Sequence, residues 1–387
     1  MDIEQYMNKS DFEKIKEFSD KVSTPCLVMD LGRIRRNYLN MEKEYKKSEI
    51  YYAVKANPEF PIIQMLGDLG SRFDIASIYE LDIVLKAGID PQRISFGNTI
   101  KKASDIRYAF DKGVRLFVTD SENDLNNLIT HAPGAKIYIR LLVEGAEYAD
   151  WPLARKFGCS IEKVRYLISA AKKRGVDIYG LSFHVGSQQR NVFEWEYALI
   201  KVKDVFDWAK KEEDVKLEMV NIGGGLPSRY LNETEPLEVY SKNINEFIEN
   251  HFADDMPRII LEPGRSLVGD SGILVTEIVL ISKKTQLDHH RWVYLDTGKF
   301  NGLIETLDEC IKYPVCYISH EDSELGDVIL AGPTCDSVDI MYEDHKYQLP
   351  MDMKMGERLY WLSAGAYTSS YASVGFNGFP PLKVYCI

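Results

Sequence analysis

The stretch Ile50–Asn57, which reads IYYAVKAN, decides the fold of this chain. Its first five residues are apolar, and an apolar run of this length beside a turn is typical of a buried strand. Lys55 closes the run, and the turn residues Asn57 and Pro58 follow. The next segment, FPIIQMLGDLG, carries apolar residues three and four positions apart, which indicates a helix. The stretch therefore predicts a strand that ends at a lysine, a tight turn and a helix.

The same strand-and-helix pattern recurs between residues 49 and 263. Seven further apolar runs follow the first: RFDIAS, RISFGN, RLFVTD, KIYIRLLV, IYGLSFHVGS, LEMVNIGGG and RIILEPGR. Eight strands that alternate with helices over about 215 residues are typical of a (β/α)8 barrel. A doubly wound sheet is the alternative α/β fold, but the first strand-to-helix turn, KANPEF, lacks its GxGxxG fingerprint.

The pattern changes after about residue 270. Short apolar runs such as ILVTEIVLIS, RWVYLDTG, DVILAG and RLYWLSAG continue, separated by turns and without helical periodicity. The segment TPCLVMDL near Pro25 also resembles a strand. We therefore expect a barrel over residues 31–270 and a β-domain, a sandwich or barrel-like sheet, built from residues 1–30 and 271–387.

Composition excludes several classes of protein. The 387 residues carry a formal net charge of -12, which opposes a nucleic-acid partner because phosphate binding needs clustered basic residues. No stretch has the length and apolarity of a membrane span, and the first residues lack a signal-peptide pattern, so a cytoplasmic protein is expected. The six cysteines have no CxxC spacing, which indicates neither a zinc site nor a disulfide framework, and no metal is expected.

The residues that close the predicted strands form the candidate site, because the active site of such a barrel lies at the C-terminal ends of its strands. A lone lysine such as Lys55 is usually a solvated residue. A partly desolvated lysine, however, has a depressed pKa and is a nucleophile able to form a Schiff base. The other strand ends decide between these interpretations, and they are Asp74, Arg140, His184, the triplet Gly223-Gly224-Gly225, Glu262 and Arg265.

Several of these strand ends suit a ligand that carries both a phosphate and an aromatic ring. The glycine triplet allows backbone N–H groups to approach a phosphate, although such a turn also occurs for backbone reasons alone. Arg265 can add a charge-assisted contact to the same phosphate. A carboxylate such as Glu262 needs a cationic or donor partner, and a protonated pyridine nitrogen is one. His184 is either a core histidine or stacks on a ring, with Ser187 near enough to donate to phosphate.

Two clusters in the β-domain are more polar and richer in glycine than plain strands. GPTCDSVD contains Cys335 and Asp336, and LSAGAYTSS contains Tyr367. Taken singly, these residues are interpreted as a structural cysteine, a turn residue and a core aromatic.

Seven motifs in this order, YYAVKANP, FDIAS, FHVGSQ, NIGGG, LEPGR, GPTCDS and GAYTSS, resemble the decarboxylase branch of the alanine-racemase-like pyridoxal-phosphate fold. The resemblance extends from about Thr24 to the C-terminus. Within that branch the chain looks like the ornithine decarboxylases of bacteria, including the type that also accepts lysine. It implies a cytoplasmic enzyme of polyamine biosynthesis.

The resemblance also implies roles for individual residues. Lys55 would hold pyridoxal 5'-phosphate as a Schiff base, Glu262 would pair with the pyridine nitrogen and His184 would stack on the ring. Asp74 and Arg140 would support the lysine and the ring. The phosphate ligands would be Ser187, the glycine triplet, Gly264, Arg265 and Tyr367.

The family further implies a homodimer with shared active sites. Cys335 of the partner subunit would protonate the product carbon, and Asp336 would bind the distal amine of ornithine. Where eukaryotic ornithine decarboxylases carry a Tyr-Asp pair, this chain has Glu305-Thr306. Glu305 is therefore expected as a second ligand of the distal amine, with a solvated helix residue as the alternative.

Three rival functions remain in view. Diaminopimelate decarboxylases share the EPGR motif but typically have CES where this chain has CDS. A noncatalytic cofactor carrier or regulatory homologue would keep the fold, but single-domain carriers lack the C-terminal β-domain and inactive regulators tend to lose the lysine or the phosphate ligands. A lysine-dependent aldolase barrel would leave the CDS and AYTSS motifs unexplained.

Overall fold

The structure is a computed structural model that describes residues 3–144, 149–151, 156–318, 320 and 322–387. The chain forms two compact units. One unit comprises Arg35–Pro227 and Glu235–Gly264, and the other comprises Met1–Ile34, Ser228–Thr234 and Arg265–Ile387. The short loop Ser228–Thr234 thus leaves the first unit between two of its strands and belongs to the second.

The first unit is a closed barrel of eight parallel strands, as the sequence predicted. In chain order the strands are β2 (Ser48–Ala53), β3 (Arg72–Ile75), β4 (Ile94–Phe96), β5 (Leu116–Thr119), β6 (Lys136–Arg140), β8 (Gly180–Ser182), β10 (Met219–Asn221) and β11 (Arg258–Leu261). The last strand pairs with the first, so that Ile259 lies opposite Ser48 and the ring closes. Each of the eight apolar runs identified in the sequence overlaps one of these strands.

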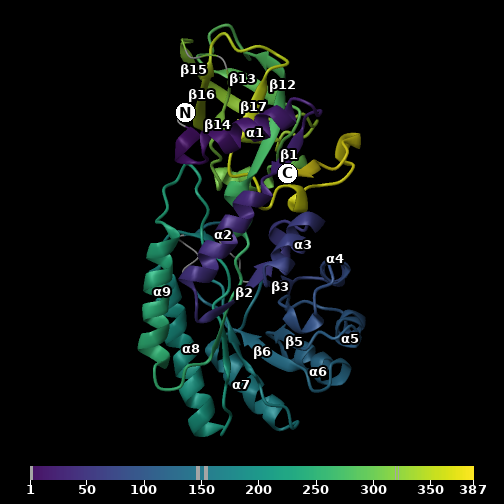
Figure 1. Cartoon of the computed structure of the whole chain (residues 1–387), viewed down its shortest axis with the longest axis vertical. Helices are drawn as coiled ribbons and strands as arrows, with labels where there is room; N and C mark the ends of the chain where they lie inside the picture. The colour runs from purple at the N-terminus through teal and green to yellow at the C-terminus, as the bar shows by residue number, and fades with distance from the viewer. Residues whose placement is uncertain (1–2, 145–148, 152–155, 319, 321) are drawn as a thin grey trace. The chain divides into compact units, whose positions relative to one another are not determined.

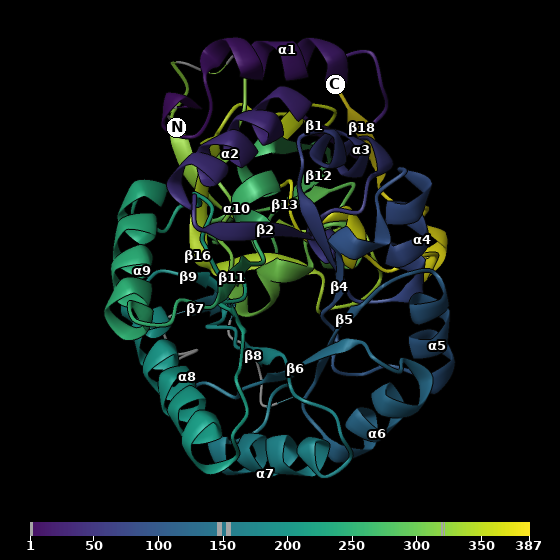
Figure 2. The same ribbon diagram turned by 60° about the horizontal axis from the view of Figure 1, so that its bottom comes forward.

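Helices follow one another around the outside of the barrel, as Figure 2 shows for α4 to α9. Three helices begin at a serine whose hydroxyl accepts the backbone N–H three residues later: Ser77, Ser121 and Ser160. Such caps satisfy N–H groups that the first turn of a helix leaves without a partner. The helices are α2 (Leu31–Glu44), α3 (Phe60–Asp68), α4 (Ile78–Lys86), α5 (Ala103–Asp111), α6 (Glu122–His131), α7 (Ile161–Lys172), α8 (Phe193–Glu212) and α9 (Leu237–Phe252).

The barrel interior is packed with side chains. Tyr51, Tyr138, Met219 and Ile260 come from four different strands and belong to one buried apolar cluster. The Tyr138 hydroxyl is satisfied by a 2.9 Å hydrogen bond with the hydroxyl of Ser95. A filled interior cannot admit a substrate, so reactive groups of this unit must lie at the strand ends.

The second unit contains an eight-stranded sheet with the order β14-β17-β12-β13-β15-β16 (Figure 1), in which β1 pairs with β12 and β18 pairs with β1. Its strands are β1 (Cys26–Met29), β12 (Gly272–Ser282), β13 (Arg291–Leu295), β14 (Val315–Cys316), β15 (Leu325–Ala331), β16 (Ile340–Pro350), β17 (Arg358–Trp361) and β18 (Lys383–Cys386). Helix α1 (Lys9–Ser19) packs its Phe12 and Ile15 into the apolar core of this sheet. The expected strand near Pro25 is β1, which pairs with β12.

The sequence did not indicate three strands. Strand β16 carries the polar run Glu343-Asp344-His345-Lys346 in its middle. The carboxylate of Glu309 accepts the backbone N–H groups of residues 343, 344 and 345 at 2.7 to 2.8 Å and so supplies the hydrogen-bond acceptors for this polar segment. Strands β7 (Ala149–Trp151) and β9 (Ser187–Gln189) form a short antiparallel pair.

The remaining helices are short. They are η1 (Ile3–Gln5), η2 (Val54–Ala56), η3 (Pro91–Arg93), α10 (Arg265–Val268), η5 (Gly269–Ser271), η6 (Lys299–Asn301), η7 (Ile304–Glu309), η8 (Ser369–Tyr371) and η9 (Phe376–Gly378). Across the part of the chain that is described, no helix has both the length and the apolar character needed to cross a bilayer.

Candidate active site

Lys55 lies at the C-terminal end of the first barrel strand, in the single turn η2. Its Nζ is 3.6 Å from Oδ2 of Asp74, which lies near the end of the neighbouring strand β3. The lysine side chain is 44% exposed, whereas that of Asp74 is 3% exposed. The amine is therefore accessible to a ligand while a buried carboxylate balances its charge.

Asp74 is a buried carboxyl group with an unusual environment. Burial raises its pKa well above the ordinary value, Glu262 raises it further, and Lys55 works in the opposite direction. Its Oδ1 is buried without a hydrogen-bond partner among the described residues. The ion pair with Lys55 is thus the main interaction that keeps this carboxylate charged.

Gly97, which was not among the predicted site residues, makes room for Asp74. It follows strand β4, and its N–H donates to the carbonyl of Ile75 at 2.9 Å. A Cβ at this position would lie 1.9 Å from Oδ1 of Asp74. The only signal in the sequence was a glycine at a strand end, and glycine is common where a strand turns into a loop.

Glu262 and the glycine triplet are joined by Asn221, the last residue of β10. The side-chain Nδ2 of Asn221 donates to Oε1 of Glu262 at 2.5 Å, and the side-chain Oδ1 of Asn221 accepts the N–H of Gly223 at 2.9 Å. The N–H of Glu262 in turn donates to the carbonyl of Gly223 at 2.8 Å. Asn221 fixes both groups, and it was not predicted as a site residue because it stands inside an apolar run.

The glycine triplet occupies a space that no side chain would fit. A Cβ on Gly223 would lie 2.3 Å from the carbonyl of Phe183, and one on Gly225 would lie 2.5 Å from the carbonyl of Gly186. Both glycines also have positive φ, 69° and 102°, which other residues rarely adopt. The loop is therefore a bare backbone cradle of the kind that accepts a phosphate.

His184 lies against this cradle. A Cβ on Gly224 would be 3.3 Å from its Nε2. Burial lowers the pKa of His184 well below its ordinary value, and the cations Arg140 and Lys55 lower it further. Its Nδ1 accepts the N–H of Gly186 at 3.1 Å, so the neutral ring carries its proton on Nε2. A neutral imidazole can lie flat against an aromatic ring without adding charge.

Arg140 and Ser187 complete the barrel group. Arg140 ends strand β6; burial lowers its pKa, whereas Glu262, Tyr138 and Asp74 raise it. Ser187 begins strand β9, and Gln189 of the same strand donates its N–H to the carbonyl of Gly225 at 2.9 Å. Within the barrel unit, the structure thus brings together the expected residues Lys55, Asp74, Arg140, His184, Ser187, Gly223, Gly224, Gly225 and Glu262.

In the second unit, Arg265 is the centre of another group. Its Nη1 donates to Oε2 of Glu305 at 2.8 Å and to the hydroxyl of Tyr230 at 2.7 Å, and its Nη2 donates to Oε1 of Glu305 at 2.6 Å. The ring of Tyr367 lies 4.8 Å from the guanidinium carbon. Tyr230 was not expected, because the loop that carries it interrupts the barrel sequence. Arg265 directly follows Gly264, the remaining expected phosphate ligand.

Cys335 and Asp336 lie on an ordered turn of the same unit. The N–H of Cys335 donates to Oδ1 of Asn377 at 3.0 Å, and Oδ1 of Asp336 accepts the N–H of Val338 at 2.9 Å. Asp339 organises the turn from within, because its buried carboxylate accepts from the N–H of Lys299 and from Thr334. The side chains of Cys335 and Asp336 are exposed.

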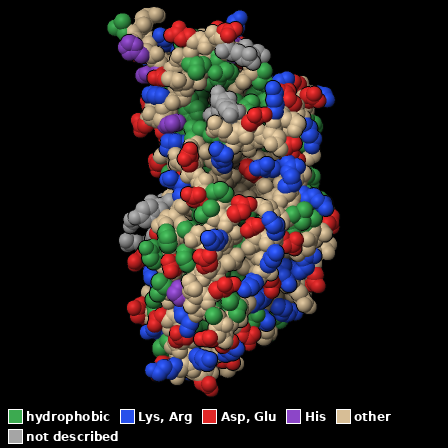
Figure 3. Space-filling model, turned by 60° about the vertical axis from the view of Figure 1, so that its left-hand side comes forward, with side chains coloured by type: hydrophobic (Ala, Val, Ile, Leu, Met, Phe, Trp, Pro, Cys, Tyr) green, Lys and Arg blue, Asp and Glu red, His purple; other side chains and the backbone are tan. Residues whose placement is uncertain are grey.

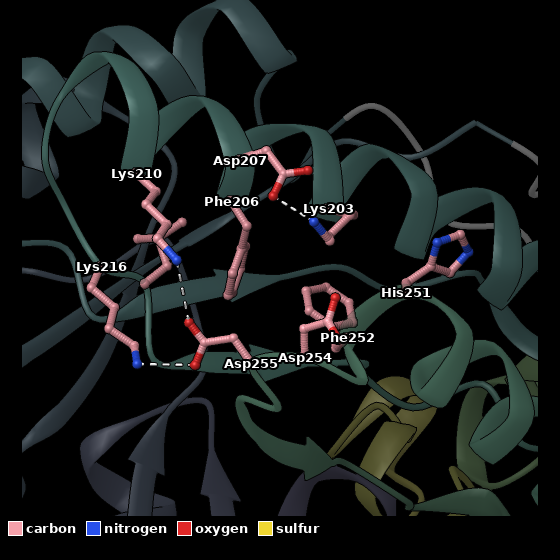
Figure 4. Close-up of a pocket in the computed structure, with 10 residues that line it drawn as sticks. Lys203, Phe206, Asp207, Lys210, Lys216, His251, Phe252, Asp254 and Asp255 are labelled. Atoms are coloured by element: carbon pink, nitrogen blue, oxygen red, sulfur yellow. Dashed lines mark hydrogen bonds and ion pairs between the residues drawn. The ribbon is translucent and has the colours of Figure 1, made fainter.

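A hollow of about 250 Å³ between the ends of α8 and α9 is a less suitable site (Figure 4). Lys210 and Lys216 both reach Asp255, and Lys203 pairs with Asp207, so each lysine already has a carboxylate partner. These pairs precede strands β10 and β11 in the chain and so lie toward the N-terminal ends of the barrel strands, whereas Lys55 follows the C-terminal end of β2. Acidic and basic side chains are interspersed over the face that Figure 3 shows. Among the described residues, no group of three His, Cys, Asp or Glu side chains is arranged to hold a metal.

Comparison with known proteins assigns the family. Residues 31–269 match the family model of the pyridoxal binding domain of pyridoxal-dependent decarboxylases. The lysine/ornithine decarboxylase of Selenomonas ruminantium is 31% identical over 370 residues, covering 95% of this chain and 90% of that protein. Antizyme inhibitor 2 of Xenopus laevis is 30% identical over 372 residues, with 92% and 80% covered.

Solved structures agree with this family. The arginine decarboxylase of Paramecium bursaria Chlorella virus superimposes with a TM-score of 0.88 at 28% identity, covering 97% of this chain and 100% of that one. The lysine/ornithine decarboxylase of Vibrio vulnificus, complexed with putrescine, gives 0.87 at 27% identity, with 98% and 99% covered. The predicted fold and cofactor are thereby confirmed. The chain belongs to the pyridoxal-dependent decarboxylases that act on basic amino acids, with pyridoxal 5'-phosphate as cofactor.

Proposed function

We propose that the chain decarboxylates L-ornithine to putrescine and accepts L-lysine as a second substrate, in polyamine biosynthesis. The observation that carries this proposal is the accessible amine of Lys55, 3.6 Å from the buried Asp74. A regulatory homologue that has lost the cofactor has no need for such a pair. The exposed carboxylate of Asp336 supports a substrate with a distal amine rather than a second carboxylate.

The residues present fit pyridoxal 5'-phosphate. The glycine cradle suits its phosphate, because any Cβ at Gly223 or Gly225 would collide with backbone carbonyls. The carboxylate of Glu262, held by Asn221, suits its ring nitrogen. When bound, the cofactor supplies an electron sink for the electrons that remain on the α-carbon after carbon dioxide leaves. The proposed phosphate ligands are Ser187, Gly223, Gly224, Gly225, Gly264, Arg265 and Tyr367.

Each barrel residue then has its own role in binding the cofactor or in holding a proton. Lys55 attaches the cofactor through Nζ and later carries a proton at this atom, while Asp74 balances the charge. Glu262 accepts the N–H of the ring nitrogen and keeps that nitrogen protonated. His184 stacks as a neutral ring with its proton on Nε2. Arg140 adds a cation near Glu262 and Asp74.

The remaining steps of the proposal need a homodimer with shared active sites. Cys335 of the partner subunit gives its Sγ proton to the α-carbon of the product, and Asp336 of the partner subunit binds the distal amine. Exposure of both side chains in a single chain supports a role at a subunit interface. No disulfide joins any of the six cysteines, which supports location in a reducing compartment such as the cytoplasm.

Product analysis tests the proposal. The purified protein with cofactor is supplied separately with ornithine, lysine, arginine and diaminopimelate, and the amines formed are identified. Putrescine from ornithine, with slower formation of cadaverine from lysine, is the expected result. Agmatine alone would assign the chain to arginine, and lysine formed from diaminopimelate would assign it to the diaminopimelate branch. Absence of carbon dioxide release from every substrate would favour a regulatory homologue, as the relationship to an antizyme inhibitor allows.

A further inference from the structure

We propose that Glu305 is a positioning residue for the cofactor: it fixes the guanidinium of Arg265 so that this arginine keeps one orientation toward the phosphate. The inference rests on the proposed function, because that function assigns Arg265 to the phosphate. It replaces the expectation that Glu305 binds the distal amine of the substrate.

The first support is the geometry of the pair. The two oxygens of Glu305 accept from the two terminal nitrogens of Arg265 at 2.6 and 2.8 Å. The exposed fractions of the arginine and glutamate side chains are 2% and 1%. A bidentate contact of this kind fixes the plane as well as the position of a guanidinium. Both oxygens of Glu305 are thus already engaged, and the buried carboxylate is not presented as a ligand for a substrate amine.

The second support is the set of groups around the arginine. The hydroxyl of Tyr230 accepts from Nη1 at 2.7 Å, and the ring of Tyr367 lies 4.8 Å from the guanidinium carbon. The glutamate and Tyr230 thus hold the edge of the guanidinium and Tyr367 covers a face. Tyr367 has a positive φ of 56°, so the backbone adopts an uncommon conformation where it presents this ring.

The third support is the rigidity of the turn that carries Glu305. In η7 the hydroxyl of Thr306 donates to the carbonyl of Leu303 at 2.7 Å, and the N–H of Ile311 donates to the carbonyl of Glu305 at 3.0 Å. At the end of the same turn, Glu309 holds three backbone N–H groups of β16. The carboxylate of Glu305 is therefore presented from a fixed position and can orient the arginine.

Replacing the glutamate with glutamine would have two opposed effects. The variant Glu305→Gln removes a negative charge, which by itself would strengthen binding of a phosphate. It also sets an amide NH2 group against an N–H of Arg265, and two donors repel each other. We expect the loss of orientation to dominate, because a guanidinium that is 2% exposed must turn to find another acceptor.

The experiment measures retention of the cofactor by the holoenzyme. Equilibrium dialysis, followed by the absorbance of bound cofactor, gives the affinity of the parent, Glu305→Gln, Arg265→Gln and the double variant. We expect each single variant to bind the cofactor about tenfold more weakly, the lower end of what orienting partners contribute. The double variant should bind no more weakly than Arg265→Gln, because Glu305 acts through the arginine. The Michaelis constant for ornithine at saturating cofactor should stay at the parent value in Glu305→Gln.

Asp308→Asn is the matched control, since it removes one negative charge from the same turn at an exposed side chain. It should retain the cofactor as the parent does. Thermal unfolding of each protein separates loss of fold from loss of affinity. If Glu305→Gln fails to fold, Glu305→Asp, which keeps the charge but shortens the reach, should show the same weakening.

The outcomes separate the phosphate role of Arg265 from the positioning role of Glu305. Unchanged retention in Arg265→Gln would refute the phosphate role of the arginine, and with it that part of the proposed function. Weakened retention in Arg265→Gln together with parental or tighter retention in Glu305→Gln would overturn the positioning role alone. Parental retention with a raised Michaelis constant for ornithine would return Glu305 to the substrate.

Discussion

Replacing Gly97 with alanine should weaken catalysis without unfolding the barrel. The new Cβ would lie 1.9 Å from Oδ1 of Asp74, whereas real Cβ contacts stay beyond 3.0 Å. The difference, 3.0 minus 1.9, requires the oxygen to withdraw by about 1.1 Å. Gly97 is not among the glycines with positive φ, so its backbone accepts alanine. The carboxyl group of Asp74 must therefore move away from Gly97, and we expect its ion pair with Lys55 to lengthen by up to the same amount.

The electrostatic consequence can be estimated from the distance of 3.6 Å between Lys55 Nζ and Asp74 Oδ2. At an effective dielectric constant of about 20, lengthening this distance by about 1.1 Å weakens the attraction by about 1 kcal/mol. Solvent around the half-exposed lysine reduces this by roughly half. The corresponding decrease in kcat/KM is about two- to sixfold.

Steady-state kinetics with ornithine provide the assay, and two controls accompany it. Gly67→Ala in helix α3 is a matched substitution, because the atom nearest to its Cβ, at 2.2 Å, would be the end of the flexible Ile89 side chain. In an Asp74→Ala background, Gly97→Ala should cause no additional loss. Parental kcat/KM in Gly97→Ala, or a loss that simply adds to that of Asp74→Ala, would refute the reasoning.

Three further substitutions are informative. Lys55→Ala should abolish both turnover and the absorbance of the attached cofactor; survival of either in a folded protein would exclude Lys55 as the attachment point. Cys335→Ala should slow decarboxylation and misdirect protonation, which appears as an aldehyde by-product in product analysis; parental kinetics and product would remove Cys335 from the mechanism. Glu309→Gln should lower the free energy of unfolding by about 1 to 3 kcal/mol in denaturant titrations, because its carboxylate accepts three backbone N–H groups. Burial raises the pKa of Glu309, but these N–H groups outweigh it and leave the pKa lowered, so this stabilisation is present above the ordinary glutamate range and is lost as pH falls through the lowered value. The difference between parent and Glu309→Gln should therefore shrink in acid, and a difference independent of pH would contradict the assignment.

The barrel could be predicted from the sequence because each of its strands is a short apolar run. A strand buried on both faces needs apolar residues throughout, and a strand end such as Lys55 or Glu262 then stands out by contrast. Strand β16 was not predicted because residues 343–346 are polar. Their backbone N–H groups are bonded by the carboxylate of Glu309, about 35 residues earlier in the chain, and no local pattern indicates this contact.

The partners of the site residues were harder to predict than the residues themselves. Asn221 looked like part of a strand, and Gly97 like an ordinary turn. The ion pair between Arg265 and Glu305 joins residues 40 positions apart. Nothing in the sequence around Arg265 or around Glu305 indicates the other residue as its partner, because the contact forms only when the chain folds. A charged residue in an exposed-looking turn could equally have faced a substrate.

The amide of Asn221 has a consequence for anyone who redesigns this enzyme. One side chain bridges the carboxylate of Glu262 and the backbone of Gly223. Under the proposed roles, the partner of the ring nitrogen and a ligand of the phosphate therefore depend on the same amide. Exchanging Glu262 for a residue of another length, in order to convert the chemistry toward racemisation, should then also weaken binding of the phosphate. A successful conversion would have to rebuild position 221 at the same time.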